Sequence, residues 1–262
     1  MIHAFRVLGR SLTLGIAEFR TIYTVRSWLL SWLVRMLAQT AFFASIGLVV
    51  NSPQAIRYLL IGNAVVLVCL EANIVVLFMA GERYQGTLTG LLATPTPPVV
   101  VLLGRGLNWV LTGAMTSLIT LSVLPVLFGI PLSALSLLEC VPIVLVTGIA
   151  SYGYGSFLGG LTLRFPQLDW LVMNVGYLLV MAFAGVNVPI SFWPDWLTAL
   201  AQVLPVTHGL QAVRGVLDGA AAGVVLGQIG LELLVGAAWF ALAAWSYRIF
   251  VQHVRARAAF VN

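Results

Sequence analysis

Two charged residues, Arg35 and Glu71, stand in stretches of the chain that are otherwise apolar. In a helix that spans a membrane, such a charge costs at least about 2.5 kcal/mol, and it usually pairs or marks a functional site. If consecutive spans are neighbours, the two residues lie roughly 12 and 15 Å from the same surface, at about 1.5 Å of helix per residue. They therefore predict an intramembrane ion pair or one shared polar site. The alternative is that Arg35 reaches the inner headgroups and that Glu71 is protonated.

A second polar pair, His208 and Arg214, lies in the apolar, proline-interrupted segment 190–219. Thr207 is a candidate N-cap and Gly219 a candidate helix stop, which predicts two short re-entrant helices that enter the outer leaflet without crossing it. His208 and Arg214 are candidates for a gate at the outer exit. A hydrogen bond at the helix start for His208 and a headgroup contact for Arg214 explain them equally well.

The residue types that bind metals or act on lipids are scattered. The other histidines are His3 and His253, and Cys69 and Cys140 lie inside apolar runs. A membrane-embedded enzyme would need histidines and carboxylates clustered near one leaflet, and a metal site or disulfide framework would need its own cluster. We therefore expect no catalytic residue and no metal site in this chain.

The composition places these residues in a membrane protein. Of 262 residues, 61% are hydrophobic and only 8% are charged, whereas a soluble domain carries roughly 25% charged residues. Apolar stretches long enough to cross the roughly 30 Å hydrocarbon layer as helices recur, and no window between them is polar enough for a soluble domain. The sequence predicts an all-α membrane domain over about residues 27–248, with six spans at about 28–50, 57–80, 106–128, 135–161, 169–188 and 225–247.

The arginines orient this domain. All 13 basic residues are arginine. Only Arg57 and Arg214 lie in segments expected on the outer side, Arg35 lies inside the first span, and the others lie on the inner side. Since cytoplasmic segments carry the excess of positive charge, both ends of the chain are expected in the cytoplasm. No basic stripe suited to nucleic acid occurs, and the net charge of +5 is explained by topology.

Residues 1–26 predict an amphipathic helix on the inner leaflet. Apolar positions such as Phe5 and Leu8 recur at spacings of three and four, while Arg6 and Arg10 fall on the opposite face. Such arginines contact anionic headgroups, and aromatic residues enter the acyl boundary. A helix that binds a soluble partner is the alternative. The charges also interrupt the apolar run that a cleavable signal peptide requires, and residues 249–262 are expected to form a cytoplasmic tail.

Small residues recur at every fourth position in the fourth span. Such a strip lets another helix approach closely, although a hinge or the lining of a pathway uses the same residue types. We expect close helix packing along Thr147, Ser151, Gly155 and Gly159.

Residues 82–95 are the most informative segment. Several apolar side chains share one helical face, and Pro95 is the first of three prolines that stop the helix before the next span. The prediction is a short amphipathic helix across the cytoplasmic surface, which a partner protein can push. The residues on its apolar face are Tyr84, Leu88, Leu91 and Leu92.

This segment resembles the coupling helix in the membrane subunits of type-2 ATP-binding-cassette (ABC) exporters. In that family an acidic and a basic residue are followed by two variable residues, Gly-Thr-Leu, further leucines and a Thr-Pro ending. The family often has Glu where this chain has Thr89, so one contact with the ATPase is expected to differ. The amphipathic first helix, the span count and the segment with Pro205, Thr207, His208 and Arg214 extend the resemblance over nearly the whole chain. The matching residues are Glu82, Arg83, Gly86, Thr87, Leu88, Leu91, Leu92, Thr94 and Pro95.

The resemblance implies a permease without its own motor. No Gly-x-x-x-x-Gly-Lys-Ser/Thr phosphate loop occurs, and the chain has no lysine, so ATP and Mg²⁺ are expected on a partner ATPase. The family assembles two permeases, identical or paralogous, with two ATPase subunits in the bacterial cytoplasmic membrane. Nucleotide-driven closure of the ATPases then moves the coupling helices and opens a path outward.

The substrate is predicted only as a class. The lack of a sizeable soluble domain and the aromatic residues of the outer segment fit export of an amphipathic small molecule, such as an antibiotic, drug or lipid-like compound. Export of a lipid-linked saccharide is the alternative within the family. A secondary transporter or channel is the alternative outside it, although such proteins more often carry intramembrane charges arranged as a relay.

Overall fold

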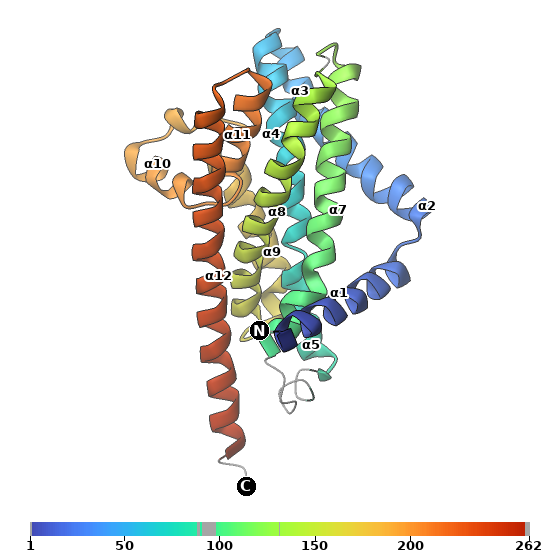
Figure 1. Ribbon diagram of the computed structural model, residues 1–262, viewed down its shortest axis with the longest axis vertical. Coiled ribbons are helices and arrows are strands. Elements are labelled where there is room, and N and C mark those ends of the chain that lie inside the picture. Colours follow the sequence, from blue (N-terminus) through green and yellow to red (C-terminus); the bar gives the residue numbers. More distant parts are fainter. Residues whose placement is uncertain (1, 88–89, 91–97, 131, 260–262) are drawn as a thin grey trace.

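The computed structural model describes residues 2–87, 90, 98–130 and 132–259, and every regular element within them is a helix. Long helices run side by side along the longest axis (Figure 1). Five of them are long and apolar enough to cross a membrane: Val25–Val49, Pro53–Tyr84, Gly104–Leu127, Ala134–Thr162 and Ala222–Gln252. The predicted all-α membrane fold is therefore confirmed. The expected fifth span is the shorter apolar helix α9 (Asp169–Phe183), whose 15 residues fall below the roughly 20 that a crossing usually needs, so a sixth crossing stays a prediction.

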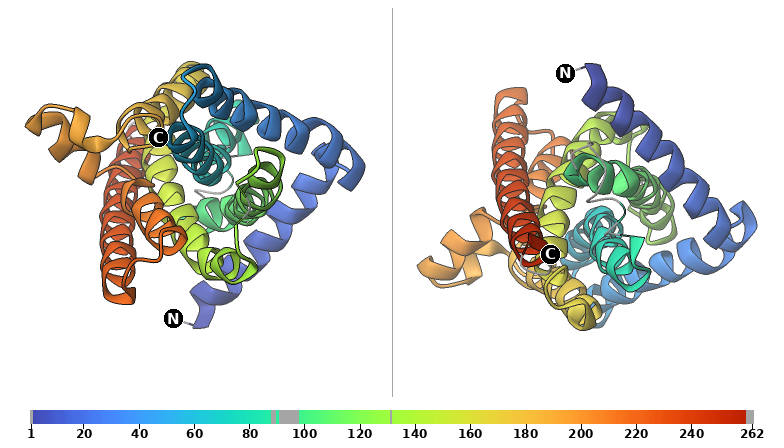
Figure 2. Two further views of the ribbon diagram at one scale, coloured as in Figure 1. Left: turned by 90° about the horizontal axis from the view of Figure 1, so that it is seen from above. Right: turned by 90° about the horizontal axis from the view of Figure 1, so that it is seen from below.

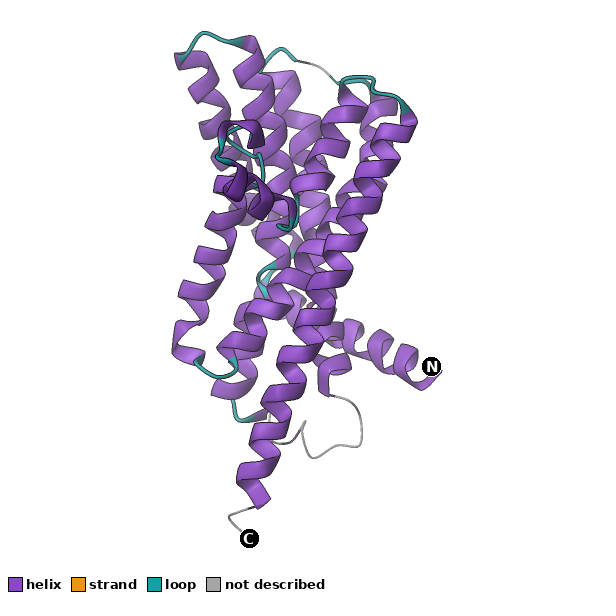
Figure 3. Cartoon of the chain, turned by 90° about the vertical axis from the view of Figure 1, so that its left-hand side faces the viewer, coloured by secondary structure: helices purple, strands orange, loops and turns teal. Residues whose placement is uncertain are grey.

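The N-terminal helix α1 (Ile2–Ile22) lies across the bundle near one end (Figures 1 and 3). Thr24 then caps α2 (Val25–Ser27), because its hydroxyl accepts a hydrogen bond from the Ser27 N–H. The first span continues through a π-helical turn, η1 (Trp28–Leu33), into α3 (Val34–Val49). Seen along the bundle, α1 and this span meet at a corner and enclose two sides of the inner helices (Figure 2).

The second span forms the core and is broken. The side chain of Ser52 caps α4 (Pro53–Ala72), in which every residue from Leu59 onward is buried. At Asn73 and Ile74 the backbone leaves the regular α-helical pattern, and α5 (Val75–Tyr84) follows. The sequence predicted one continuous helix over 57–80, because hydropathy measures the length of an apolar stretch and not its bends.

The remaining long helices are α7 (Pro98–Leu127), α8 (Ala134–Thr162) and α12 (Ala222–Ala259). Helix α12 packs along α8 and continues as helix well beyond the predicted span, through most of the expected tail. The small-residue strip of α8 is buried. A Cβ atom on Gly155 would press on Asn73, one on Gly159 would press on Met79, and Thr147 packs against Gly209. The strip therefore brings α8 close to the break between α4 and α5.

Short helices join α9 to α12: η3 (Ile190–Phe192), α10 (Asp195–Gln202) and α11 (Thr207–Leu217). Another short turn, η2 (Pro166–Leu168), precedes α9. Gly219 ends α11 with a φ of 71°, as predicted for a helix stop. The prediction that Thr207 is the N-cap is wrong by one residue, since Val206 occupies that position and the Thr207 hydroxyl donates to the carbonyl of Ala201.

The elements divide between the two ends of the bundle. Helix α1, the end of α5, the start of α7 and the end of α12 lie at one end, while the turns after α3, α7 and α11 lie at the other (Figure 1). The predicted inner segments thus share one end. That this end faces the cytoplasm stays a prediction from the arginine count.

Candidate coupling site and adjoining cavity

Arg105, near the start of α7, joins three helices. Its guanidinium pairs through Nη1 with Glu82 at the end of α5 and through Nη2 with Glu18 of α1. Glu82 also accepts a hydrogen bond from the Thr87 hydroxyl. At the same crossing, Gly15 lies so close to the Arg105 carbonyl that a Cβ atom would overlap it. The beginning of segment 82–95 is therefore fixed where α1, α5 and α7 meet.

Arg83 fixes the same segment to a fourth helix. Its guanidinium donates to the backbone carbonyls of Leu163 and Arg164 at the end of α8, the latter at 3.0 Å. A cation is favourable there, because the last carbonyls of a helix carry partial negative charge.

The segment predicted from the sequence is placed only in part. Glu82 is buried and Arg83 donates to its own chain, whereas Tyr84 is 61% exposed. Gly86 has a φ of 71°, a conformation that favours glycine and ends α5. Leu88, Leu91, Leu92 and Pro95 lie outside the described residues. Since Glu82 and Arg83 hold the segment to its own helices, any partner surface rests on the remaining residues.

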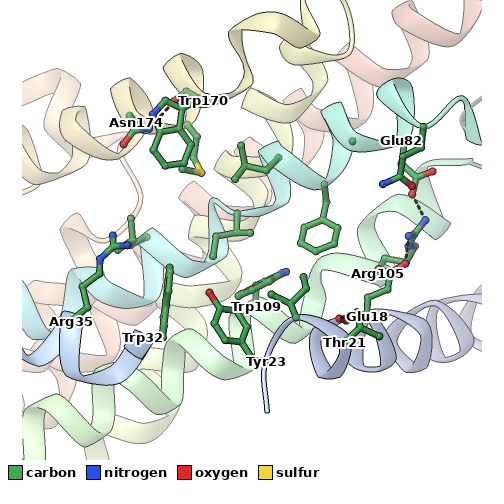
Figure 4. Close-up of a pocket in the computed structure, with 18 residues that line it drawn as sticks. Glu18, Thr21, Tyr23, Trp32, Arg35, Glu82, Arg105, Trp109, Trp170 and Asn174 are labelled. Carbon is green, nitrogen blue, oxygen red and sulfur yellow. Dashed lines mark hydrogen bonds and ion pairs between the residues drawn. The ribbon is translucent and has the colours of Figure 1, made fainter. Parts of the chain in front are cut away.

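A cavity of about 650 Å³ adjoins this site. Its wall is formed by residues of α1, η1, α3, α4, α5, α7 and α9, and of the connections that follow α1, α4 and α5. Glu18, Glu82 and Arg105 lie at one end and Arg35 at the other (Figure 4). Burial raises the pKa of the Tyr23 phenol above its usual value, so the phenol stays protonated at neutral pH. The aromatic residues in the wall are Tyr23, Trp32, Phe78, Trp109 and Trp170.

The predicted ion pair between Arg35 and Glu71 is not formed in the described part of the chain. Glu71, which is fully buried, accepts hydrogen bonds from Trp32 Nε1 at 2.9 Å and from the Thr116 hydroxyl. The Arg35 guanidinium instead lies over the Trp32 ring, 5.1 Å from its centroid. The direct pair is therefore wrong for this structure, in which both neutral donors bond Oε1 of Glu71. The other form of the prediction, one shared polar site, stays a prediction. Trp32 is the neighbour that both residues share.

At the opposite end, Glu232 of α12 holds the start of α11. Its two carboxylate oxygens accept from the backbone N–H groups of Val206 at 2.8 Å and Gly209 at 2.9 Å. Glu232 is fully buried, and Gln228, one turn before it, bonds the imidazole of His208 at 2.8 Å. This carboxylate takes the capping role that the sequence assigned to Thr207.

Arg214 holds α11 from its other side. It donates to the carbonyls of Gly185 at 2.9 Å and Tyr58 at 3.2 Å, and it lies 3.6 Å from the centroid of the Tyr58 ring. The structure thus ties both predicted outer residues, His208 and Arg214, to neighbouring helices and loops. It separates them from Arg35 and from the cavity at the other end.

Sequence reasoning missed the roles of Glu18, Arg105 and Glu232. In the sequence, Arg105 served only to orient the membrane domain. Its partners Glu82 and Glu18 lie 23 and 87 residues away, beyond any helical period. The available signal was Glu18 itself, the one acidic residue among residues 1–26, which suggests a specific cationic partner.

The family model described as ABC-2 type transporter matches residues 11–217, which run from α1 to the end of α11. No curated protein matches the chain significantly. The matched region contains the Arg105 bridge, the cavity and the short helices α10 and α11. The match confirms the resemblance that residues 82–95 carried, and the chain belongs to the ABC-2 type transporter family, as a membrane-spanning permease.

Proposed function

We propose that this permease exports an amphipathic small molecule, driven by a separate ATPase that docks on segment 82–95. The observation that carries the proposal is the bridge from Glu82 through Arg105 to Glu18. The segment begins where α1, α5 and α7 are held together, and these helices also line the cavity. A push on the segment would therefore be passed to several cavity walls.

The cavity supports the choice of cargo. Its volume of about 650 Å³ falls within the roughly 300–1,000 Å³ of typical small-molecule sites. Aromatic and aliphatic side chains dominate the wall, and the charges are confined to its two ends (Figure 4). A molecule with an apolar body and one polar end fits this distribution.

The assembly expected for this function is two permeases, identical or paralogous, with two ATPase subunits that bind ATP and Mg²⁺. Both ends of the chain would lie in the cytoplasm. Fusions of a reporter that works only in the cytoplasm should be active after Gly86 or residue 262 and inactive after Ser52 or Asp195.

The decisive variant is Leu91→Asp, which introduces a charge into the proposed apolar docking face. ATP-dependent export by the reconstituted assembly should be abolished, and the ATPase should co-purify less well. Leu91→Met, which keeps the face apolar at similar volume, is the matched control and should export normally. Full ATP-dependent export by Leu91→Asp would show that this segment does not couple the ATPase to the permease.

A further inference from the structure

Arg35 lines the cavity and has no acidic partner in the described part of the chain. The other cavity arginine, Arg105, is shared by Glu18 and Glu82. A charge at membrane depth is normally paired, because the hydrocarbon layer solvates it poorly. Arg35 therefore presents to the cavity a positive charge for which the described residues supply no counter-ion.

The neighbouring carboxylate does not fill this role. Glu71 is directed to Trp32 Nε1 and the Thr116 hydroxyl, and it does not line the cavity. Trp32 stands between the two charged groups, with its ring beneath Arg35 and its N–H on Glu71. A guanidinium stacked on a ring in this way keeps its N–H edge for a further acceptor.

We propose that the cavity binds an amphiphile whose anionic headgroup, a phosphate or carboxylate, pairs with Arg35. The inference deepens the proposed function, since it assigns a charge to the transported class. Guanidinium groups bind both anions through paired N–H···O bonds. The Tyr23 hydroxyl, another lining group, adds a neutral donor.

The charge distribution also orients this ligand. At the far end of the cavity two carboxylates share one guanidinium, so that end carries excess negative charge and repels an anionic headgroup (Figure 4). The headgroup then lies beside Arg35, and the apolar part lies against Leu70, Ile74 and Leu77. A cationic amphiphile would be repelled by the positive charge of Arg35.

Tryptophan fluorescence tests the proposal, because Trp32, Trp109 and Trp170 line the cavity. The purified ATPase-containing assembly, in phosphatidylcholine nanodiscs without ATP, is titrated with a bromine-labelled alkyl phosphate or with a bromine-labelled alkyl trimethylammonium of equal chain length. The phosphate should quench at about tenfold lower concentration, as expected for one charge-assisted contact. Equal quenching by the two probes would overturn the proposal.

Variants assign the effect to Arg35. Arg35→Gln should raise the half-quenching concentration of the alkyl phosphate about tenfold, whereas Arg35→Lys, which keeps the charge, should retain most of the affinity. Arg26→Gln is the matched control, because Arg26 is exposed just before η1 and does not line the cavity. Wild-type quenching in Arg35→Gln would overturn the assignment. If Arg35→Gln does not fold, the comparison of the two probes on the wild-type assembly still decides.

A competition arm identifies the source of the anion. Displacement of the alkyl phosphate by phosphatidylglycerol would identify a membrane lipid headgroup, and its failure to compete would identify a transported anionic amphiphile; both results support the site.

A second copy of the chain that fills the cavity would abolish quenching by every probe and overturn the proposal. Since no step uses ATP, intact binding with lost export would refute the proposed function alone.

Discussion

At both ends of the bundle, charged side chains hold short elements in place, but their partners differ. The partners are side chains at one end and backbone groups at the other. At the end with α1, the Arg105 bridge joins side chain to side chain; Arg105 and Glu18 remain 23% and 34% exposed, while Glu82 is buried. At the other end, fully buried Glu232 binds backbone N–H groups, and Arg214 binds backbone carbonyls.

This difference indicates that the Arg105 bridge is a movable contact. The contacts of Glu232 and Arg214 with backbone groups, which we call the anchor, are fixed. Ion pairs between partly exposed side chains contribute about 0–1 kcal/mol each and exchange partners readily, which suits an element that must move. Buried polar groups left without partners cost about 1–3 kcal/mol each, so backbone groups tied to a buried charge resist rearrangement. We therefore interpret the contacts of the Arg105 bridge as movable and α11 as fixed.

The largest effect is expected from Glu232→Ala, which leaves the N–H groups of Val206 and Gly209 buried and unpaired. Stability should fall by about 4 kcal/mol, measured as the loss of folded protein on heating in detergent. Glu232→Gln, with one carbonyl acceptor left, should lose about half as much. Glu139→Ala, at an exposed position of α8, is the matched control. Equal stability of Glu232→Ala and the control would show that Glu232 does not hold the start of α11.

Arg214→Ala tests whether the outer pair is a gate or part of the anchor. It removes two hydrogen bonds and the stacking on Tyr58, so stability should fall by about 3 kcal/mol. The rate of export per folded molecule should stay unchanged if Arg214 only supports α11. A lower rate at equal folded amount would favour the gate. Arg248→Ala, at an exposed position of α12, controls for loss of charge.

A smaller loss of stability, about 2 kcal/mol, is expected for Arg105→Gln, because Arg105 and Glu18 are partly exposed while Glu82 is buried. Its main effect should be on coupling: ATP hydrolysis should continue while the amount exported per ATP falls severalfold. Arg164→Gln is the control, since the hydrogen bonds of Arg164 among the described residues are made by its backbone. Unchanged export per ATP in Arg105→Gln would exclude the bridge as a transmission element.

The sequence predicted those features that local patterns determine. Apolar length identified the five helices that are long enough to span a membrane, and Gly219 marked the end of α11, because both depend on neighbouring residues. The break after Ala72 depends on packing between distant helices, with Gly155 close against Asn73. The cap of α11 comes from Glu232, 26 residues after the N–H of Val206 that it binds.

The candidate site was predictable to a similar degree. The spacing of residues 82–95 identified the segment and led to the family that the model match confirms. The cavity was not predicted, since its wall is assembled from residues between Glu18 and Asn174. The pairing of Arg35 with Glu71 failed because depth in the membrane does not determine which donor reaches a carboxylate first.

The smallest effect is expected at Trp32, the residue that both Arg35 and Glu71 contact. Trp32→Phe keeps a ring beneath Arg35 but removes the N–H that binds Glu71, so stability should fall by about 1 kcal/mol. Trp245→Phe, on an exposed face of α12, should change nothing measurable.

The structure also predicts that Arg35→Glu and Glu71→Arg are each defective and that their combination restores nothing, because Trp32 and Thr116 hold Glu71. Partial rescue of folding by the double swap would mean that Arg35 and Glu71 pair directly in the assembled transporter.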